Sequence, residues 1–87
     1  MKISGRQVAA ARGLLNWSQD QLALAADVTA QTVKNWENEH HLPRQATMDR
    51  VREAIEARGV EFTNGGQPGV RFKAKPGTAA ERESAAD

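Results

Sequence analysis

The chain has 87 residues, of which 39% are hydrophobic, with twelve Lys and Arg, eleven Asp and Glu, and no cysteine. This length allows one small domain near the lower limit for a single core, and the lack of cysteine excludes disulfides and thiolate metal sites. The net charge is only +1, but an acidic stretch over residues 76–87 masks a mildly basic body. No apolar run reaches transmembrane length and no signal-peptide hydrophobic region follows the start, so we expect a soluble cytoplasmic protein.

The first predicted helix begins after Ser4, which can act as its N-cap. Val8, Ala11 and Leu15 then fall on one face at helical spacing. Asn16 can end this helix because Asn tolerates the left-handed conformation better than most residues.

Two short helices joined by a tight turn are predicted over residues 19–37, QDQLALAADVTAQTVKNWE. Ser18 and Gln21 have the spacing of a capping box at the start of the first of them. Ala23 stands mid-way along that helix, where only a small side chain lets a second helix cross closely. Thr29 can cap the second helix after the turn.

The second helix of this pair has one inward and one outward face. Val33 and Trp36 lie one turn apart and face inward. The side chains that remain outside are those of Thr29, Ala30, Gln31, Lys34 and Asn35. Amides and a lysine on an exposed short helix suit base edges and phosphates in a DNA major groove. The pattern therefore predicts a helix-turn-helix, with DNA binding as the leading hypothesis.

A fourth amphipathic helix is predicted after the polar loop 38–44. Met48, Val51 and Ile55 mark its apolar face, and Gly59 closes its C-terminal end. We therefore expect a DNA-binding domain over residues 1–59.

Two short β-prone runs follow, Val60–Thr63 and Val70–Lys73, around a turn-rich link. We expect a hairpin over residues 60–73 with a Glu61–Arg71 pair on one face and an apolar other face, made by Val60, Phe62, Val70 and Phe72. An isolated hairpin is marginal in water, so the apolar face must rest on the fourth helix or on a second subunit. We favour both; a loosely attached ribbon without a role in assembly is the alternative. Residues 74–87 lack apolar periodicity and are expected to be disordered.

A pattern specific in combination runs through the helices: Arg12, Ser18-Gln19, Leu22-Ala23, Val28-Thr29, Val33 and Trp36-Glu37. With it, residues 4–58 resemble the phage-repressor class of DNA-binding domains, also called the XRE or Cro-like helix-turn-helix family. The ending GVEF…GVRF is similar to that of short bacterial members, which carry a strand pair after the fourth helix. Two positions depart from the family pattern, since Asp27 and Glu39 stand where glycine is usual.

The resemblance implies a fold and a set of roles. The fold is mainly α, a compact four-helix repressor-like domain with a C-terminal hairpin. Base contacts are implied for Thr29, Ala30, Gln31 and Asn35. Phosphate contacts are implied for Ser18, Gln19, Lys34, Asn38, Arg44 and Gln45. Arg12 and Glu37 are implied to form a largely buried ion pair that ties the first helix to the recognition helix.

Each assignment has a plainer alternative. Gln31 and Asn35 could be solvated residues on an exposed helix, and Arg12 and Glu37 could be independent surface charges. Core packing suits Trp36 better than base stacking. Metal binding by the adjacent histidines 40–41 is a weak hypothesis without a patterned third ligand. Contact with the DNA backbone suits them better, and plain solvent exposure better still.

No motif for catalysis, phosphate binding by a loop, or metal binding is present, so we expect neither an enzyme nor a cofactor. The sequence favours a sequence-specific transcriptional regulator that binds inverted-repeat operators in double-stranded DNA as a homodimer. The alternative is a protein-interaction module, such as the antitoxin of a toxin–antitoxin pair. Salt-dependent DNA binding separates the two, although a DNA-binding antitoxin would show both activities.

Overall fold

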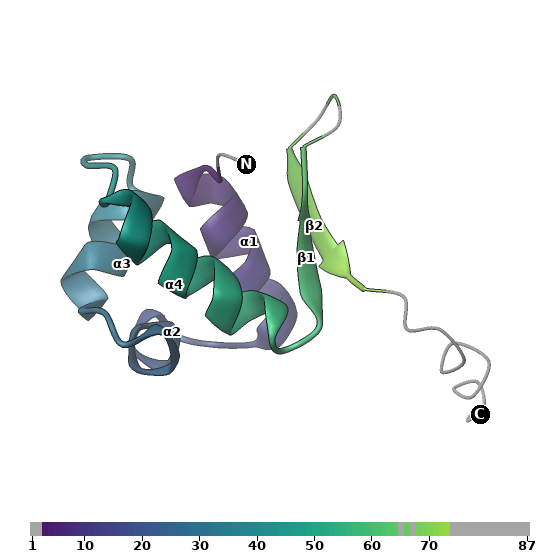
Figure 1. Cartoon of the computed structure of the whole chain (residues 1–87), viewed down its shortest axis with the longest axis horizontal. Coiled ribbons are helices and arrows are strands. Elements are labelled where there is room, and N and C mark those ends of the chain that lie inside the picture. The colour runs from purple at the N-terminus through teal and green to yellow at the C-terminus, as the bar shows by residue number, and fades with distance from the viewer. Residues whose placement is uncertain (1–2, 65, 67, 74–87) are drawn as a thin grey trace.

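Four helices lie on one side of a two-stranded hairpin in the computed structural model, which describes residues 3–64, 66 and 68–73 (Figure 1). The elements are α1 (Gly5–Leu15), α2 (Gln19–Ala26), α3 (Ala30–Glu37), α4 (Gln45–Glu56), β1 (Val60–Thr63) and β2 (Gly69–Phe72). The predicted fold, four helices followed by a C-terminal hairpin, is confirmed. The predicted tail over residues 74–87 lies outside the described residues.

Side-chain caps set where the first three helices begin. Ser4 Oγ accepts a hydrogen bond from the backbone N–H of Gln7, and Gln7 Oε1 accepts one from the backbone N–H of Ser4. Ser18 and Gln21 form the same reciprocal box at the start of α2. Thr29 caps α3 through its hydroxyl. These boundaries are therefore encoded by local sequence.

The first three helices end through residues in the left-handed conformation, Asn16, Asp27 and Glu39, with φ of 59°, 58° and 60°. At the end of α3 the Glu39 N–H donates to the carbonyl of Trp36, and the next N–H donates to the carbonyl of Asn35, both at 2.9 Å. This pair of bonds is the Schellman motif, which usually places glycine at the left-handed position. The chain thus leaves α3 by the usual route, with glutamate in place of glycine.

One hydrophobic core joins the helices and the hairpin. Its largest fully buried side chains are those of Trp36, Leu22, Ile55, Val8, Val33, Val51 and Val60. From the hairpin, Phe62 is only 5% exposed. Strand β1 is therefore part of the same core as the four helices, and the hairpin is not a loosely attached ribbon.

The start of α1 crosses the end of α3 at very short range, and Gly5 makes this possible. A Cβ atom at Gly5 would lie 2.0 Å from the carbonyl oxygen of Trp36 and 2.9 Å from the Cα of Glu37. No side chain fits there, so only glycine allows this crossing.

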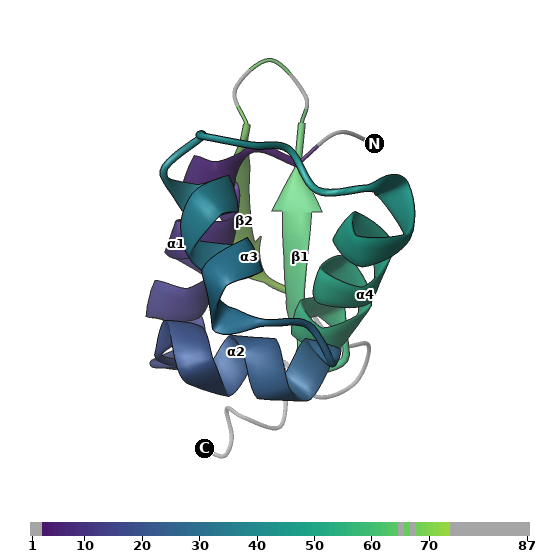
Figure 2. The same cartoon turned by 90° about the vertical axis from the view of Figure 1, so that its left-hand side faces the viewer.

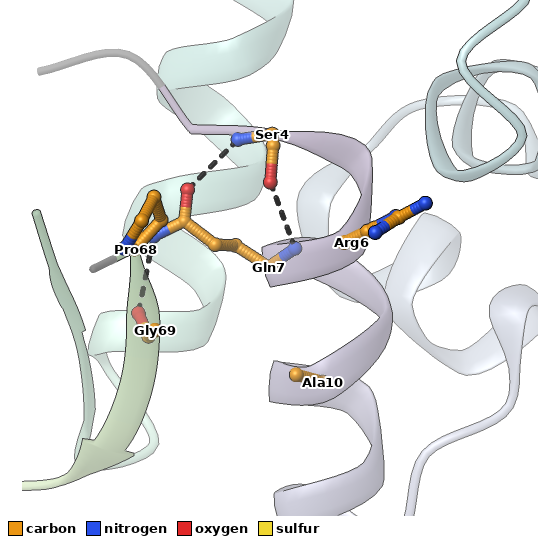
Figure 3. Close-up of a pocket in the computed structure, with 6 residues that line it drawn as sticks. All are labelled: Ser4, Arg6, Gln7, Ala10, Pro68 and Gly69. Atoms are coloured by element: carbon orange, nitrogen blue, oxygen red, sulfur yellow. Dashed lines mark hydrogen bonds between the residues drawn. The ribbon is translucent and has the colours of Figure 1, made fainter.

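A buried glutamine fastens the hairpin to α1. The side chain of Gln7 is 4% exposed, and its Nε2 lies 3.1–3.2 Å from the carbonyl oxygens of Thr63 and Gly69 and from Asn64 Oδ1. Figure 3 shows the amide reaching from α1 to Gly69 while its oxygen accepts the bond from Ser4. One side chain thus joins the helix cap to both strands.

The hairpin is antiparallel, and opposite residues are Val60 and Phe72, Glu61 and Arg71, Phe62 and Val70, and Thr63 and Gly69. Glu61 and Arg71 form an ion pair on the face away from the apolar side chains. On the apolar face Val60 is fully buried, Val70 is half-buried and Phe72 is 56% exposed. The end of β2 therefore leaves part of the apolar face uncovered.

Candidate nucleic-acid interface

The helices α2 and α3 occupy the side of the molecule opposite the hairpin. In Figure 2 they face the viewer, with β1 and β2 behind them. Val33 and Trp36 are fully buried against the rest of the core, so the opposite face of α3 remains at the surface. This outward face is what a helix needs to enter a DNA groove.

The four residues predicted to contact bases are not equally accessible. Thr29 and Gln31 are exposed, and Asn35 is half-buried at the surface of α3. Ala30 is half-buried, and its side chain packs partly against the core. As the first residue of α3 it lies next to the turn, where α3 meets α2.

Two of these residues form a single hydrogen-bonded unit. Gln31 Nε2 donates to Asn35 Oδ1 over 2.9 Å, one turn further along α3. The Gln31 carbonyl and the Asn35 NH₂ group remain for an acceptor and a donor contact. Such a pairing of donor and acceptor matches the major-groove edge of adenine.

Most residues predicted to contact phosphate are exposed and border α3. Exposed side chains are those of Ser18, Lys34, Asn38, Arg44 and Gln45. The Ser18 hydroxyl accepts a bond from the backbone of α2, which leaves its own proton as a donor. Gln45 Nε2 donates to Asp49 Oδ1 over 2.9 Å. The loop 38–44 carries Asn38 and Arg44 from the end of α3 to the start of α4 (Figure 2).

Arg12 and Glu37 form a bidentate ion pair between α1 and α3. Arg12 Nε lies 2.6 Å from Glu37 Oε2, and Arg12 Nη2 lies 2.8 Å from Oε1. The two side chains are 21% and 6% exposed. The hydrogen bond to Glu37 raises the pKa of Arg12, outweighing the opposite effect of burial. Two independent surface charges would not show this geometry.

The same pair reaches α2. Arg12 Nη1 donates over 2.9 Å to the carbonyl of Trp17, which precedes the Ser18 cap. Gln19 Nε2 donates over 3.0 Å to Glu37 Oε1. The first residue of α2 is therefore attached to the last residue of α3.

Other residues of this region were not assigned from the sequence. Thr32 and His41 line a pocket of about 150 Å³ with Asn35 and Pro43, so the loop brings a histidine beside α3. The guanidinium of Arg58 lies 5.1 Å from the centre of the Trp17 ring, a cation–π contact. The sequence alone does not predict either contact, because both depend on how the loop and the end of α4 fold back.

The described part of the chain has no helix long and apolar enough to cross a membrane. Within residues 3–64, 66 and 68–73 no group of three or more His, Cys, Asp or Glu is placed to hold a metal ion.

A search of curated proteins gives no match to the chain. A family model described as helix-turn-helix matches residues 8–61, which include most of α1, the other three helices and the beginning of the hairpin. This match includes α2, the turn and α3, together with the Arg12–Glu37 pair. The chain belongs to the XRE/Cro-like helix-turn-helix family of DNA-binding regulators.

Proposed function

We propose that this protein is a sequence-specific transcriptional regulator that acts in the cytoplasm and binds inverted-repeat operators as a homodimer. The observation that carries the proposal is the exposed Gln31–Asn35 amide pair on α3, flanked by donors suited to phosphate. No catalytic role is assigned to the chain.

In this proposal α3 enters the major groove. Gln31 and Asn35 read base edges as a unit, Thr29 contacts the groove from the helix start, and Ala30 meets a thymine methyl with the part of its side chain that is accessible. The Thr29 hydroxyl lies 2.8 Å from that of Thr32, so a base contact through Thr29 competes with an internal bond. The amide pair is therefore the stronger reader.

Phosphate contacts frame this helix on both sides. Ser18 and Gln19 bind at the N-terminus of α2, where free backbone N–H groups favour an anion. On the other side the contacts come from Lys34, Asn38, Arg44 and Gln45. These contacts fix the position of α3 without carrying base information.

The homodimer forms through the hairpin. Lys73 N–H donates over 2.7 Å to the Gly59 carbonyl. In an antiparallel pair, residues that bond to the partner strand alternate with residues whose backbone groups point outward. The backbone N–H and C=O groups of Val70 and Phe72 therefore point away from β1. Among the described residues no further strand lies beside β2. A second β2 strand would pair with these groups and cover the exposed Phe72 ring.

Edge-to-edge pairing also suits DNA binding. Antiparallel strands of two subunits are related by a twofold axis perpendicular to the sheet, so both sets of helices lie on the same face of the joined sheet. Because the helices lie on one side of the hairpin (Figure 1), both α3 helices face the same way. This is the arrangement that an inverted repeat requires.

Footprinting on the DNA upstream of its own gene tests the proposal, followed by titration of the protected sequence at several salt concentrations. We expect protection of two half-sites about one helical turn apart, and affinity that falls steeply with salt. A scrambled duplex of equal length is the control. Absence of DNA binding at low salt would favour a pure protein-interaction module instead.

A further inference from the structure

The carboxylate of Glu37 serves two residues at once. Its Oε1 accepts from Arg12 Nη2 over 2.8 Å and from Gln19 Nε2 over 3.0 Å, while Oε2 accepts from Arg12 Nε over 2.6 Å. We propose that Glu37 is a positioning residue for DNA binding, which holds the Gln19 amide ready for a phosphate and so couples the start of α2 to the recognition helix. This inference rests on the phosphate contact of Gln19 in the proposed function.

The bond to Glu37 decides how the amide of Gln19 is presented. A phosphate oxygen only accepts hydrogen bonds, whereas an amide has a donor end and an acceptor end. An unattached glutamine therefore turns its carbonyl toward the phosphate part of the time. The bond holds the nitrogen end beside the first turn of α2, with one N–H used and the other left to donate. The orientation is fixed before DNA arrives, which lowers the ordering cost of binding.

The carboxylate of Glu37 is itself held in a fixed position. Its side chain is only 6% exposed, and three donors from two other helices surround its two oxygens. Glu37 is also the last residue of α3. Any displacement of α3 in the groove therefore moves the atom that holds Gln19.

Arg12 makes this arrangement compatible with DNA. An uncompensated carboxylate next to a phosphate site would repel it, but Arg12 pairs with Glu37 through two bonds. Arg12 Nη1 also holds the Trp17 carbonyl, two residues before Gln19. The guanidinium of Arg12 thus neutralises the Glu37 carboxylate and fixes the backbone just before α2.

A double-mutant cycle on duplex DNA tests the proposal, with the variants Gln19→Ala, Glu37→Gln and the combination. An amide at position 37 turns a donor toward one of its donor neighbours, so it no longer satisfies both Arg12 and Gln19. We expect Gln19→Ala to lower affinity by roughly tenfold, the usual scale for a bond to a charged group. In the Glu37→Gln protein the same change should cost less than about twofold. Equal losses from Gln19→Ala in both backgrounds would overturn the proposal.

Gln45 supplies a matched control. Its amide donates to Asp49 instead of Glu37, and it belongs to the same proposed set of phosphate contacts. Gln45→Ala should therefore lower affinity by the same factor whether or not Glu37 is replaced. If the loss of affinity caused by Gln45→Ala also disappears in the Glu37→Gln protein, Glu37→Gln distorts the whole DNA-binding surface. That outcome contradicts a positioning role for Glu37.

A measurement on the unaltered protein removes the dependence on folding of the variants. In proton NMR of the DNA-free protein we expect the two Nε2 protons of Gln19 to exchange with solvent at different rates, the one bonded to Glu37 more slowly than the other. Equal exchange would contradict the proposal. The variants also distinguish the phosphate contact of Gln19 from the positioning role of Glu37. If Gln19→Ala leaves the affinity for all DNA unchanged, the phosphate contact itself is wrong. If Gln19→Ala lowers affinity by the same factor with and without Glu37→Gln, only the role of Glu37 is wrong.

Discussion

Gln31 is the residue whose replacement tests base reading most directly. Its side chain is exposed on α3 and bonded to Asn35, so Gln31→Ala removes one reader and releases the other. We expect specific binding to weaken by about 1–3 kcal/mol and the preference at one base position per half-site to relax. Titration against the operator and its point variants measures this. Gln19→Ala is the comparison and should weaken binding to all sequences alike; equal losses on operator and random DNA for Gln31→Ala would contradict the assignment.

The Arg12–Glu37 pair is expected to matter for stability as well. Removing one partner leaves the other charge poorly solvated, so Arg12→Met or Glu37→Gln should cost about 3 kcal/mol, the lower end of the range for buried pairs, because Arg12 keeps some exposure. Thermal or urea unfolding gives the value.

The pair Arg52–Glu56 is a matched control, since its atoms are 4.0 Å apart and both side chains are 34% exposed. Glu56→Gln should change stability by less than about 1 kcal/mol. Similar small changes at both pairs would mean that Arg12 and Glu37 act as surface charges.

Glu39 is a residue at which the protein can be stabilised. With φ of 60° it adopts the left-handed conformation at the end of α3, which costs a residue with a Cβ about 1–2 kcal/mol. Glu39→Gly removes this strain but adds freedom to the unfolded chain, which offsets part of it. We expect a net gain of about 0.5–1 kcal/mol in unfolding free energy. Glu39→Ala keeps the strained conformation and should give no comparable gain; a melting temperature lowered by glycine would show that the carboxylate has a favourable contact of its own.

Among the elements, the crossing of α1 over α3 is the most restrictive contact. Gly5→Ala would place a Cβ 2.0 Å from the Trp36 carbonyl oxygen, so the two helices must separate. We expect a loss of about 3 kcal/mol or more, the upper range for overpacking, in denaturant unfolding. Gly13 is the control on the same helix, because a Cβ there meets nothing within 4 Å. Gly13→Ala should instead stabilise by about 1 kcal/mol, and equal effects at both glycines would show that α1 shifts freely.

The sequence predicted those elements whose signals are local. Ser4, Ser18 and Thr29 cap helices through the adjacent chain, and the spacing of Val33 and Trp36 set the inward face of α3. All of these rest on periodicity or on a bond within four residues. The fold class followed from them, whereas the family came from the resemblance of the combined residue pattern.

Features that depend on distant segments could not be predicted. No periodic pattern predicts that Gln7 is buried, yet it is, because the hairpin, more than fifty positions later, folds onto it. Gly5 lies in no predicted turn. Glycine is needed at this position because the backbone of α3 passes very close to it. The bond from Gln19 to Glu37 likewise joins two helices. Periodicity reports which face is inward, but not which atom meets it.

The whole molecule separates two surfaces, with α3 on one side and the hairpin on the other (Figures 1 and 2). Truncation after Gly59 would not be a clean test of whether the hairpin forms the dimer contact. Val60 is fully buried and Phe62 is 5% exposed, so their removal would open the core. The exposed Phe72 is the position at which assembly can be changed without this damage.

Phe72→Ser should shift the protein toward monomer and weaken operator binding while leaving the melting temperature of the monomer almost unchanged. The ring is 56% exposed in one subunit, so its loss costs the single chain little but removes apolar area that a second β2 strand would cover. Sedimentation measures the mass, and operator titration measures the loss of binding.

Two variants bracket this result. Phe62 lies in the core, so Phe62→Ser should lower the free energy of unfolding by about 3–5 kcal/mol, as other truncations of large core side chains do. Leu24→Ser removes an equally apolar side chain that is 84% exposed on α2, and it should leave the mass unchanged. If the intact protein sediments as a dimer and Phe72→Ser does so at the same concentrations, the contact lies elsewhere. The exposed face of α4 would then be the surface to test, because it too leaves both α3 helices free to reach DNA.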